Sequence, residues 1–228
     1  MELKDYLFYK DDWAEIYCAD CRDILPMLEP VDLVLTDPPY GIDGSSGTIN
    51  MARGKGNYSL RFTDNQEYIE TVVVPIIVCL IKIVIAVVVT PGNKNLSKYP
   101  QPDSFGTFYQ PASVGLQSFG NADSQPIFYY GKNPIGRNMG IPCSYILTEQ
   151  PENNGHPCPK PIKAWQRLLS NISLSGQSIL DPFMGSGTTL VAAKNLNRKS
   201  IGIEIEPKYC EIAVKRLRQE VFDFRKRE

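Results

Sequence analysis

The sequence predicts an α/β protein built on an open, mostly parallel β-sheet with helices on both faces. Three observations lead to this prediction. Apolar runs of strand length, rich in β-branched residues, recur along the 228 residues and indicate strands buried on both faces. Segments of helical length lie between several of these runs. Near residues 178–195, a short apolar run leads into a Gly-rich turn and the start of a helix, an arrangement typical of the ligand-binding edge of such a sheet.

The apolar runs predict seven strands, and no internal repeat is present. The strands are expected near residues 14–19, 31–36, 83–90, 105–110, 126–131, 178–181 and 200–204. After the last of them, the segment from Pro207 to Leu217 has helical apolar spacing and a charged face, which predicts a helix packed on the core.

The stretch from Val72 to Val89 is apolar enough to suggest a membrane span. Pro75 and Lys82 interrupt it, however, and a spanning helix needs about twenty apolar residues. We interpret the stretch as a helix, started by Asp64-Asn65-Gln66-Glu67, followed by a buried strand from Ile83 to Val89. No membrane partner is therefore expected.

The composition is that of an ordinary soluble enzyme. With 43% hydrophobic residues the chain can bury one sizeable core, which predicts a single domain over residues 1–228. The net charge of −1 gives no overall sign of nucleic-acid binding, although basic residues could gather on one face. Six cysteines without paired Cys-x-x-Cys motifs, and the absence of an apolar leader after Met1, predict a reduced, cytoplasmic protein. A metal at Cys18 and Cys21 is an alternative that lacks a second ligand pair.

The tetrapeptide Asp37-Pro38-Pro39-Tyr40 follows the apolar run of residues 31–36, so it should leave the carboxyl end of a buried strand. Two prolines fix successive φ angles and remove two N–H donors, which leaves carbonyl acceptors free beside an acid and an aromatic ring. Such a turn suits a flat ring bearing an amino group: Tyr40 can stack on the ring while Asp37 and the Pro38 carbonyl accept hydrogen bonds from the NH2. The alternative is an ordinary Asp-Pro turn after a strand.

The second motif is Asp181-Pro182-Phe183-Met184-Gly185-Ser186-Gly187-Thr188-Thr189, between a short strand and a helix start. Glycines let the backbone approach a ligand, and the next strand ends in Glu204, where an acid can bind a ribose diol. Leu190 replaces the third glycine of a dinucleotide site, and no Gly-Lys-Ser/Thr of a phosphate loop follows. The motif therefore predicts a nucleoside site.

Together the two motifs resemble those of the S-adenosylmethionine-dependent DNA amino-methyltransferases, and their chain order is similar to that of the permuted β group. Ile16 to Cys21 resembles the acidic segment that meets the cofactor adenine. His156-Pro157-Cys158-Pro159-Lys160-Pro161 resembles the His-Pro-x-x-Lys-Pro segment beside the cofactor's methionine part, with Cys158-Pro159 in place of Thr-Gln. A further departure is Gln125-Pro126, where many relatives have an acidic residue before the aromatic strand.

The resemblance implies a Rossmann-like, seven-stranded class I methyltransferase fold in which the strands before Asp181 and Asp37 lie side by side. It implies catalysis by Asp37, Pro38, Pro39 and Tyr40, with His156 shaping the cofactor segment and Lys160 pairing with the cofactor carboxylate. The expected cofactor-binding residues are Asp20, Cys21, Lys160, Asp181, Pro182, Phe183, Gly185, Ser186, Gly187, Thr188, Thr189 and Glu204.

Two segments are candidates for contact with DNA. The Gly-rich stretch of residues 41–61 follows the catalytic turn, and residues 131–155 occupy the place of a short target-recognition region. Their basic residues could meet phosphate, although each could equally be a solvated surface residue. These residues are Arg53, Lys55, Arg61, Lys132 and Arg137. Because the second segment is short, we expect a homodimer or a partner subunit on duplex DNA.

Four functions fit these residues. The first is site-specific N6 methylation of adenine in DNA, within restriction-modification, because Asp precedes Pro-Pro-Tyr. The second is N4 methylation of cytosine by the same pocket chemistry. The third is methylation of RNA or another amine, and the fourth is a non-catalytic, cofactor-binding subunit, against which the intact Asp37 and Tyr40 argue.

Overall fold

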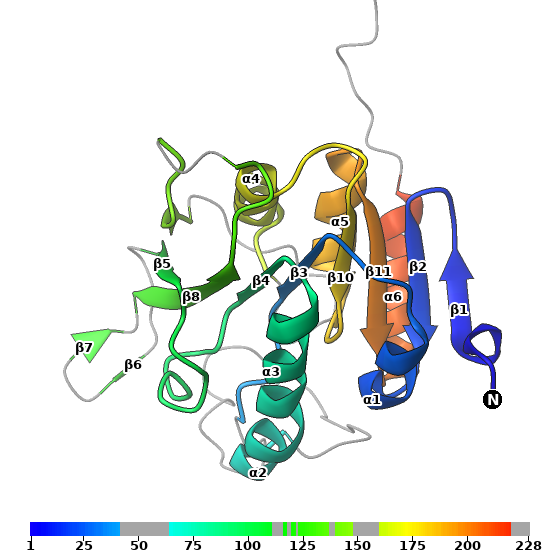
Figure 1. The fold of residues 1–228 in the computed structure, drawn as a ribbon, viewed down its shortest axis with the longest axis horizontal. Helices are drawn as coiled ribbons and strands as arrows, with labels where there is room; N and C mark the ends of the chain where they lie inside the picture. The colour runs from blue at the N-terminus through cyan, green and yellow to red at the C-terminus, as the bar shows by residue number, and fades with distance from the viewer. Residues whose placement is uncertain are drawn as a thin grey trace, which may run out of the picture.

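The computed structural model describes residues 1–41, 64–110, 123–136, 140–147 and 160–219, together with the backbone of two short paired strands, β6 (Leu116–Gln117) and β7 (Gly120–Asn121). Its centre is a nine-stranded sheet with the order β1-β2-β11-β10-β3-β4-β8-β5-β9 (Figure 1). The strands are β1 (Leu7–Lys10), β2 (Ala14–Cys18), β3 (Leu33–Thr36), β4 (Ala86–Val89), β5 (Ser104–Tyr109), β8 (Ser124–Gly131), β9 (Tyr145–Ile146), β10 (Ser178–Asp181) and β11 (Lys199–Glu204).

The predicted fold class is confirmed. Neighbouring strands from β2 through β11, β10 and β3 to β4 are parallel, while β1 and β8 pair antiparallel with their neighbours. All seven predicted strands are present, and the edge strands β1 and β9 are additional. β10 and β3 lie side by side, with Ile179 opposite Leu33, as the permuted order implied.

Helices cover both faces of the sheet (Figure 1). One face carries α1 (Cys21–Ile24), α2 (Gln66–Tyr68), the π-helical turn η4 (Ile69–Val73) and α3 (Val74–Ile83). The other carries α4 (Ile162–Ile172), α5 (Thr188–Asn195) and α6 (Pro207–Arg218). Two 3-10 turns, η1 (Leu3–Tyr6) and η2 (Leu25–Met27), complete the described helices.

Strand β4 shows why the apolar runs have no polar alternation. Val87 and Val89 pack in the core beneath α3, whereas Ala86 and Val88 pack in the core beneath α4. Both faces of the strand are therefore buried, as expected for a central parallel strand. In the second core, Trp165 of α4 stacks on Phe108 of β5 with ring centroids 5.0 Å apart, which fixes α4 against the sheet.

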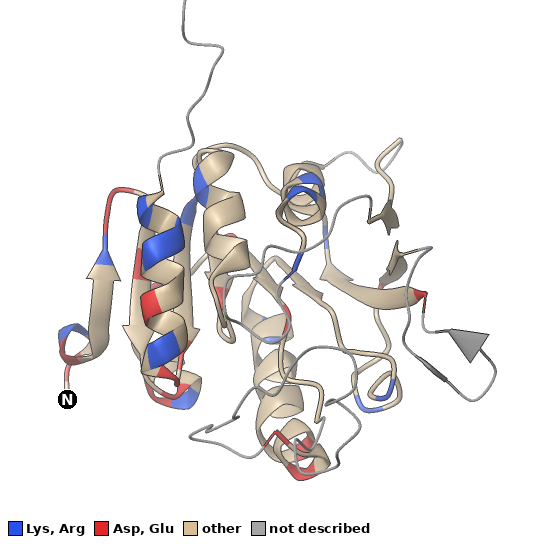
Figure 2. Ribbon diagram, turned by 180° about the vertical axis from the view of Figure 1, so that it is seen from behind, with Lys and Arg blue, Asp and Glu red and all other residues tan. Residues whose placement is uncertain are grey.

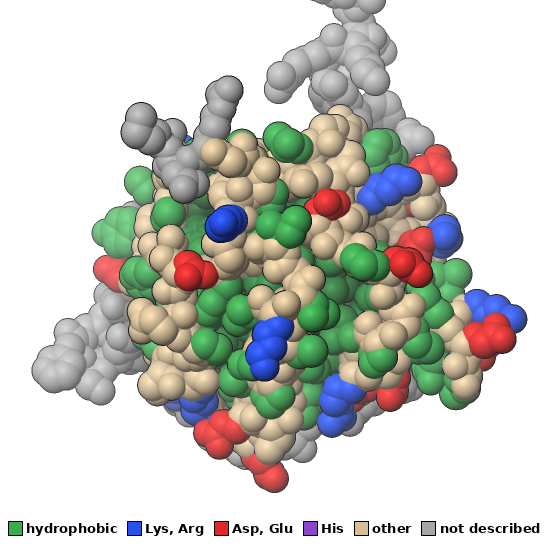
Figure 3. All heavy atoms as spheres, in the orientation of Figure 1, with side chains coloured by type: hydrophobic (Ala, Val, Ile, Leu, Met, Phe, Trp, Pro, Cys, Tyr) green, Lys and Arg blue, Asp and Glu red, His purple; other side chains and the backbone are tan. Residues whose placement is uncertain are grey.

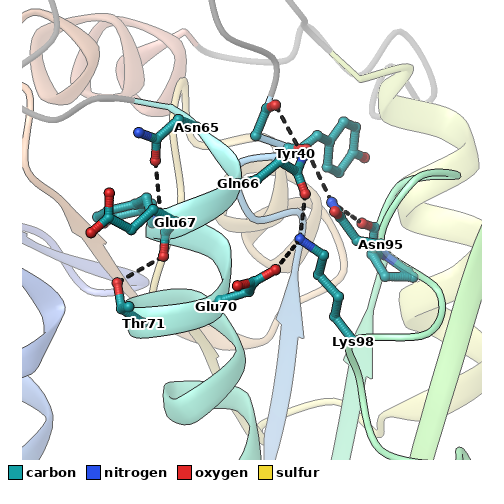
Figure 4. Close-up of polar contacts among 11 residues, drawn as sticks. Tyr40, Asn65, Gln66, Glu67, Glu70, Thr71, Asn95 and Lys98 are labelled. Atoms are coloured by element: carbon teal, nitrogen blue, oxygen red, sulfur yellow. Dashed lines mark hydrogen bonds and ion pairs between the residues drawn. The ribbon is translucent and has the colours of Figure 1, made fainter.

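The predicted helix start is confirmed, but the predicted strand start at Ile83 is wrong. Asn65 caps the helix, its Oδ1 accepting from the Tyr68 amide at 2.9 Å (Figure 4). The helix continues through Pro75 to Ile83, and the strand begins only at Ala86. Ile83 and Ile85 are 71% and 63% exposed, so they belong to the connection and not to the core. No helix in the described part of the chain has the length and apolarity needed to cross a membrane.

The parallel strands β2, β11, β10, β3 and β4 all point the same way, so their carboxyl ends line one edge of the sheet (Figure 1). Thr36, the last residue of β3, pairs with Val89, the last residue of β4. Asp181 and Glu204 end β10 and β11. Both predicted motifs therefore meet at this edge, where open α/β sheets bind their ligands.

Candidate active site

Asp37 follows β3 directly, and four segments of the chain supply hydrogen-bond donors to its carboxylate. The hydroxyls of Tyr40 and Thr90 donate to Oδ1, and the Gln125 amide donates to the same atom at 3.2 Å. The Lys160 ammonium forms an ion pair with Oδ2 at 2.6 Å. Thr90 follows β4, Gln125 lies near the start of β8 and Lys160 precedes α4, so the sheet order itself assembles this cluster.

Tyr40 is held at both its hydroxyl and its backbone. Its hydroxyl accepts from the Gln125 amide and from Lys160 at 3.2 Å, and the Lys160 ammonium lies 5.1 Å from the ring centroid. Its backbone carbonyl accepts from Asn95 at 3.0 Å and from Gln66 at 3.3 Å (Figure 4). Lys98 contacts Gln66 and pairs with Glu70 at 2.6 Å, which anchors this side of the turn to the helix that follows Asn65 (Figure 4).

Gly92 lies directly against the Tyr40 ring. Its φ of +73° is a left-handed conformation that other residues rarely adopt, and a Cβ at this position would be 2.9 Å from the ring. Glycine is therefore required by both the backbone and the ring contact. Asn95, which is fully buried, links the same loop to Tyr40 because its amide donates to the carbonyls of Pro91 and Tyr40.

The Gly-rich turn connects β10 to α5 and is held from two sides. Gly187 caps α5 at φ +75°, and a Cβ there would lie 2.7 Å from the Cβ of Ala213 in α6. Buried Arg216 of α6 donates to the Ser186 carbonyl at 2.7 Å and to the Thr188 hydroxyl at 3.1 Å. These contacts fix the turn at the carboxyl edge of the sheet.

Glu204 holds the turn from its other side. Its Oε2 accepts from the Gly185 amide at 3.0 Å and its Oε1 accepts from the Glu206 amide at 2.8 Å. Burial raises the pKa of Glu204 to about 7, although these two hydrogen bonds stabilise the anion and act to lower the pKa. A carboxylate has about four acceptor sites, so two remain for a ligand's hydroxyls.

Asp181 connects the two predicted motifs. The buried Thr36 hydroxyl donates to its Oδ1 at 2.6 Å, and the Phe183 amide donates to the same atom at 3.2 Å. Burial raises the pKa of Asp181 to about 6. Because Thr36 immediately precedes Asp37, this bond fixes the spacing between the Asp37–Tyr40 turn and the Gly-rich turn.

The first acidic segment lies next to Glu204. The amide of Ala19 donates to the Glu204 carbonyl at 3.0 Å, which places Asp20 and Cys21 beside the end of β11. Asp20 caps α1 and pairs with Arg22 at 2.6 Å, and these hydrogen bonds lower its pKa. Cys21 is buried in the core beneath α3, and burial raises the pKa of its thiol to about 12.

The remaining predicted cofactor residues occupy or adjoin the Gly-rich turn. Pro182 is buried, Phe183 is partly buried and packs on the core beneath α3, and Thr189 is the second residue of α5. The hydroxyl of Thr189 accepts from the Trp165 indole at 3.1 Å. Lys160 is the exception, since it contacts Asp37 and Tyr40.

The structure does not bring Lys132 to the site. It follows β8, whose end pairs with Ala86 at the amino end of β4, opposite the edge where Asp37 lies. Arg53, Lys55, Arg61 and Arg137 lie outside the described residues, as do His156 and Cys158. β9 forms part of the predicted recognition segment of residues 131–155, and its role in recognition stays a prediction.

Basic side chains do not gather on the face that carries α3. On this face, described Lys and Arg side chains lie apart, with Asp and Glu between them (Figure 3). On the opposite face, exposed Lys208, Lys215 and Arg218 of α6 alternate with Glu211 (Figure 2). The described residues also contain no group of three His, Cys, Asp or Glu side chains that could hold a metal, so the alternative at Cys18 and Cys21 gains no support.

The sequence did not predict the roles of three residues at the site. These are Thr90 and Gln125, which contact Asp37, and Asn95, which contacts Tyr40. Thr90 had a signal, because a polar residue directly after the apolar run of β4 faces the same edge as Asp37. In the sequence, Gln125 differs from the acidic residue that many relatives have at this place, and this difference does not indicate a contact with Asp37. Its contact with Asp37, 88 positions away, depends on β8 pairing with β4.

Comparison with known proteins gives type II methyltransferases among the relatives of this chain. The chain is 42% identical over 87 residues to the type II methyltransferase M2.DpnII of Streptococcus pneumoniae, a match that covers 37% of this chain and 32% of that protein. It is 26% identical to the type II methyltransferase M.HpaI of Haemophilus parainfluenzae over 92% of this chain and 76% of that protein. The chain thus matches only about a third of the length of M2.DpnII.

The fold also matches a solved structure. The crystal structure of the M1.HpyAVI–SAM complex superposes with a TM-score of 0.64 at 24% identity, covering 90% of this chain and all of the other. A model of the N6/N4 DNA methylase family matches residues 91–215, more than half of the 228 residues, including the Gly-rich turn and Glu204. The chain therefore belongs to the N6/N4 family of DNA methylases.

Proposed function

We propose that this protein is a site-specific DNA methyltransferase that transfers a methyl group from S-adenosylmethionine to the N6 amine of adenine in duplex DNA. The observation that carries the proposal is the adjacency of two sites. The Asp37–Tyr40 turn follows β3, and the Gly-rich turn follows its neighbour β10; the 2.6 Å bond between Thr36 and Asp181 connects them. Glu204, the acid proposed to bind the ribose, ends the next strand, β11. Family membership supports methylation of a DNA amine, and the fold shared with the M1.HpyAVI–SAM complex supports S-adenosylmethionine as the donor.

The residues around the Gly-rich turn fit the cofactor. Glu204 keeps two acceptor sites, which match the two hydroxyls of a ribose, and Gly187 has no room for a side chain that would fill the turn. Asp20 and Cys21 stand beside Glu204 on the adenine side, where Cys21 would act through its backbone because its side chain is buried. When bound, the cofactor supplies an electrophilic methyl group on a sulfonium.

The catalytic turn then acts on the target amine. The lone pair of an aromatic amine is delocalised into the base, which makes the nitrogen a poor nucleophile. Asp37 and the Pro38 carbonyl would accept hydrogen bonds from the amine and draw electron density onto its nitrogen. The nitrogen would then form a bond to the methyl carbon while the methyl–sulfur bond breaks, which releases the cofactor as its uncharged thioether. Asp37 also faces the positive charge that develops on this nitrogen and can accept its proton.

The target base has to leave the duplex, because stacking hides its amine. Tyr40 offers a replacement stacking face, and its contacts with Asn95, Gln66 and Gly92 hold the ring in place before the base arrives. A role in restriction-modification follows from the relatives, which are type II methyltransferases. The small recognition segment supports action as a homodimer or with a partner subunit.

Labelled S-adenosylmethionine, incubated with the protein and mixed-sequence duplex DNA, tests the proposal. After digestion to nucleosides, we expect the label in N6-methyladenine. Label in N4-methylcytosine would select the alternative amine, which the same acceptors could serve. Label in RNA alone would overturn the choice of DNA, and cofactor binding without transfer to any nucleic acid would favour a non-catalytic subunit.

A further inference from the structure

The Lys160–Asp37 ion pair occupies the place where the target amine has to bind. Lys160 Nζ lies 2.6 Å from Asp37 Oδ2 and 3.2 Å from the Tyr40 hydroxyl. The two side chains of the ion pair are only 15% and 23% exposed, so water screens their contact weakly. A positive side chain thus contacts both the proposed catalytic acid and the ring proposed to stack on the base.

The two carboxylate oxygens of Asp37 differ in the capacity they have left to accept hydrogen bonds. Oδ1 accepts three hydrogen bonds, from Tyr40, Thr90 and Gln125, which is more than its two lone pairs hold ideally. Among the described residues, Lys160 is the donor to Oδ2. The target amine must therefore use Oδ2, beside the ammonium.

An ammonium at this position opposes the proposed reaction. The amine nitrogen becomes positive as it takes the methyl group, and a like charge within a few ångströms disfavours that state in a partly buried site. The reaction therefore requires Lys160 to withdraw from Oδ2 before methyl transfer. Because its stem is long and flexible, Lys160 can move its ammonium by rotation of its side chain.

The second partner lies on the side of the Gly-rich turn. Lys160 precedes α4, and in the first turn of that helix Trp165 donates to Thr189 in the first turn of α5 at 3.1 Å. The start of α4 thus lies between the catalytic turn and the cofactor turn. With S-adenosylmethionine at the Gly-rich turn, as proposed above, the anion available to Lys160 would be the cofactor's carboxylate.

We propose that Lys160 is a positioning residue that exchanges partners: it pairs with Asp37 in the free protein and with the cofactor carboxylate in the complex. This proposal rests on the proposed function, and it adds an order of events. Cofactor binding removes the ammonium from Oδ2, so that Asp37 accepts the target amine only when a methyl donor is in place.

Calorimetric titration with two thioether ligands tests the exchange without methyl transfer. S-adenosylhomocysteine carries the amino-acid carboxylate, whereas 5′-methylthioadenosine has the same nucleoside and thioether without it. In the free protein Asp37 competes with the ligand carboxylate for Lys160. Asp37→Asn should therefore tighten S-adenosylhomocysteine binding about three- to tenfold and leave methylthioadenosine binding unchanged.

The gain in affinity for S-adenosylhomocysteine in Asp37→Asn should depend on Lys160. In a Lys160→Met background, Asp37→Asn should no longer tighten S-adenosylhomocysteine binding, and Lys160→Gln should give the same result with a polar side chain. Lys82→Met, at an exposed site in the last turn of α3, is the matched control and should preserve the gain. Thermal unfolding of each variant shows that it is folded before titration.

Two results would overturn the exchange. One is Asp37→Asn binding S-adenosylhomocysteine no more tightly than the wild type does. The other is an equal gain for methylthioadenosine, which would show that the ligand carboxylate plays no part. Failure of the wild type to bind S-adenosylhomocysteine at all would instead contradict the proposed function, so the two failures are distinguishable.

Discussion

Glu204→Gln tests the cofactor site through one side chain. The Glu204 carboxylate pairs the amides of Gly185 at 3.0 Å and Glu206 at 2.8 Å, so Ala at this position would leave two buried amides unpaired and loosen the turn. Gln keeps the shape and one carbonyl acceptor but removes the negative charge. A change in affinity then reports the lost charge more directly than it reports a damaged turn.

The expected loss follows from the bond type. A hydrogen bond between a ribose hydroxyl and a charged acceptor contributes about 1.5–3 kcal/mol, so S-adenosylhomocysteine should bind roughly 10- to 150-fold more weakly to Glu204→Gln at pH 8. Glu211→Gln on the exposed face of α6 is the matched control and should bind as the wild type does. Titration calorimetry measures both.

Burial raises the pKa of Glu204 to about 7 from an ordinary value of 4.5, which gives the pH dependence its sign. The hydroxyls need the ionised carboxylate, so wild-type affinity should fall below pH 7 by up to about tenfold per unit, and Glu204→Gln should be flat. The free energy of unfolding should change in the opposite direction: the contribution of Glu204 to stability is complete below pH 4.5 and is lost as the pH rises through about 7. Unchanged affinity in Glu204→Gln, or a wild-type affinity independent of pH between 6 and 8, would refute this assignment.

Three further predictions concern the catalytic turn and the assembly. Tyr40→Phe keeps the ring but loses the hydroxyl contact to Asp37, so single-turnover methylation should slow about tenfold. Tyr40→Ala should slow it further, because stacking contributes about 1–3 kcal/mol per base. Equal rates in both variants would contradict a stacking role. Gly92→Ala places a Cβ against the Tyr40 ring at a left-handed φ. It should therefore lower the free energy of unfolding, measured in urea, by at least about 1 kcal/mol. An unchanged free energy of unfolding would contradict the observed packing. The short recognition segment offers little surface for DNA, whereas specific single modules bury about 600–1,000 Å² and many readers bury more, so light scattering should show a dimer or a complex with a partner. A monomer that binds specific DNA tightly would contradict this.

The strands could be predicted because both faces of the sheet are covered, which makes each central strand a continuous apolar run. The boundary between α3 and β4 could not, because Ile83 and Ile85 are as apolar and β-branched as the buried residues beside them, although both are exposed. The edge strands β1 and β9 escaped prediction for a related reason: a short strand with a solvent-facing side has little apolar pattern.

The two motifs of the site could be predicted because each is local: a strand end followed by a turn with its own chemistry. The contacts that orient Asp37 are not local. Lys160 lies 123 positions away along the chain, and nothing in its own segment distinguishes a contact with Asp37 from the expected contact with a cofactor carboxylate. Only the position of α4 against the sheet and α5 places Lys160 beside the catalytic turn.

The most direct measurement of the central claim is methyl transfer by Asp37→Ala. Asp12→Ala removes an exposed acid and is the matched control. With labelled S-adenosylmethionine and mixed-sequence duplex DNA, the wild type and Asp12→Ala should form N6-methyladenine, whereas folded Asp37→Ala should form none while it still binds S-adenosylhomocysteine. Near wild-type methylation by Asp37→Ala would contradict the assignment of catalysis to this turn.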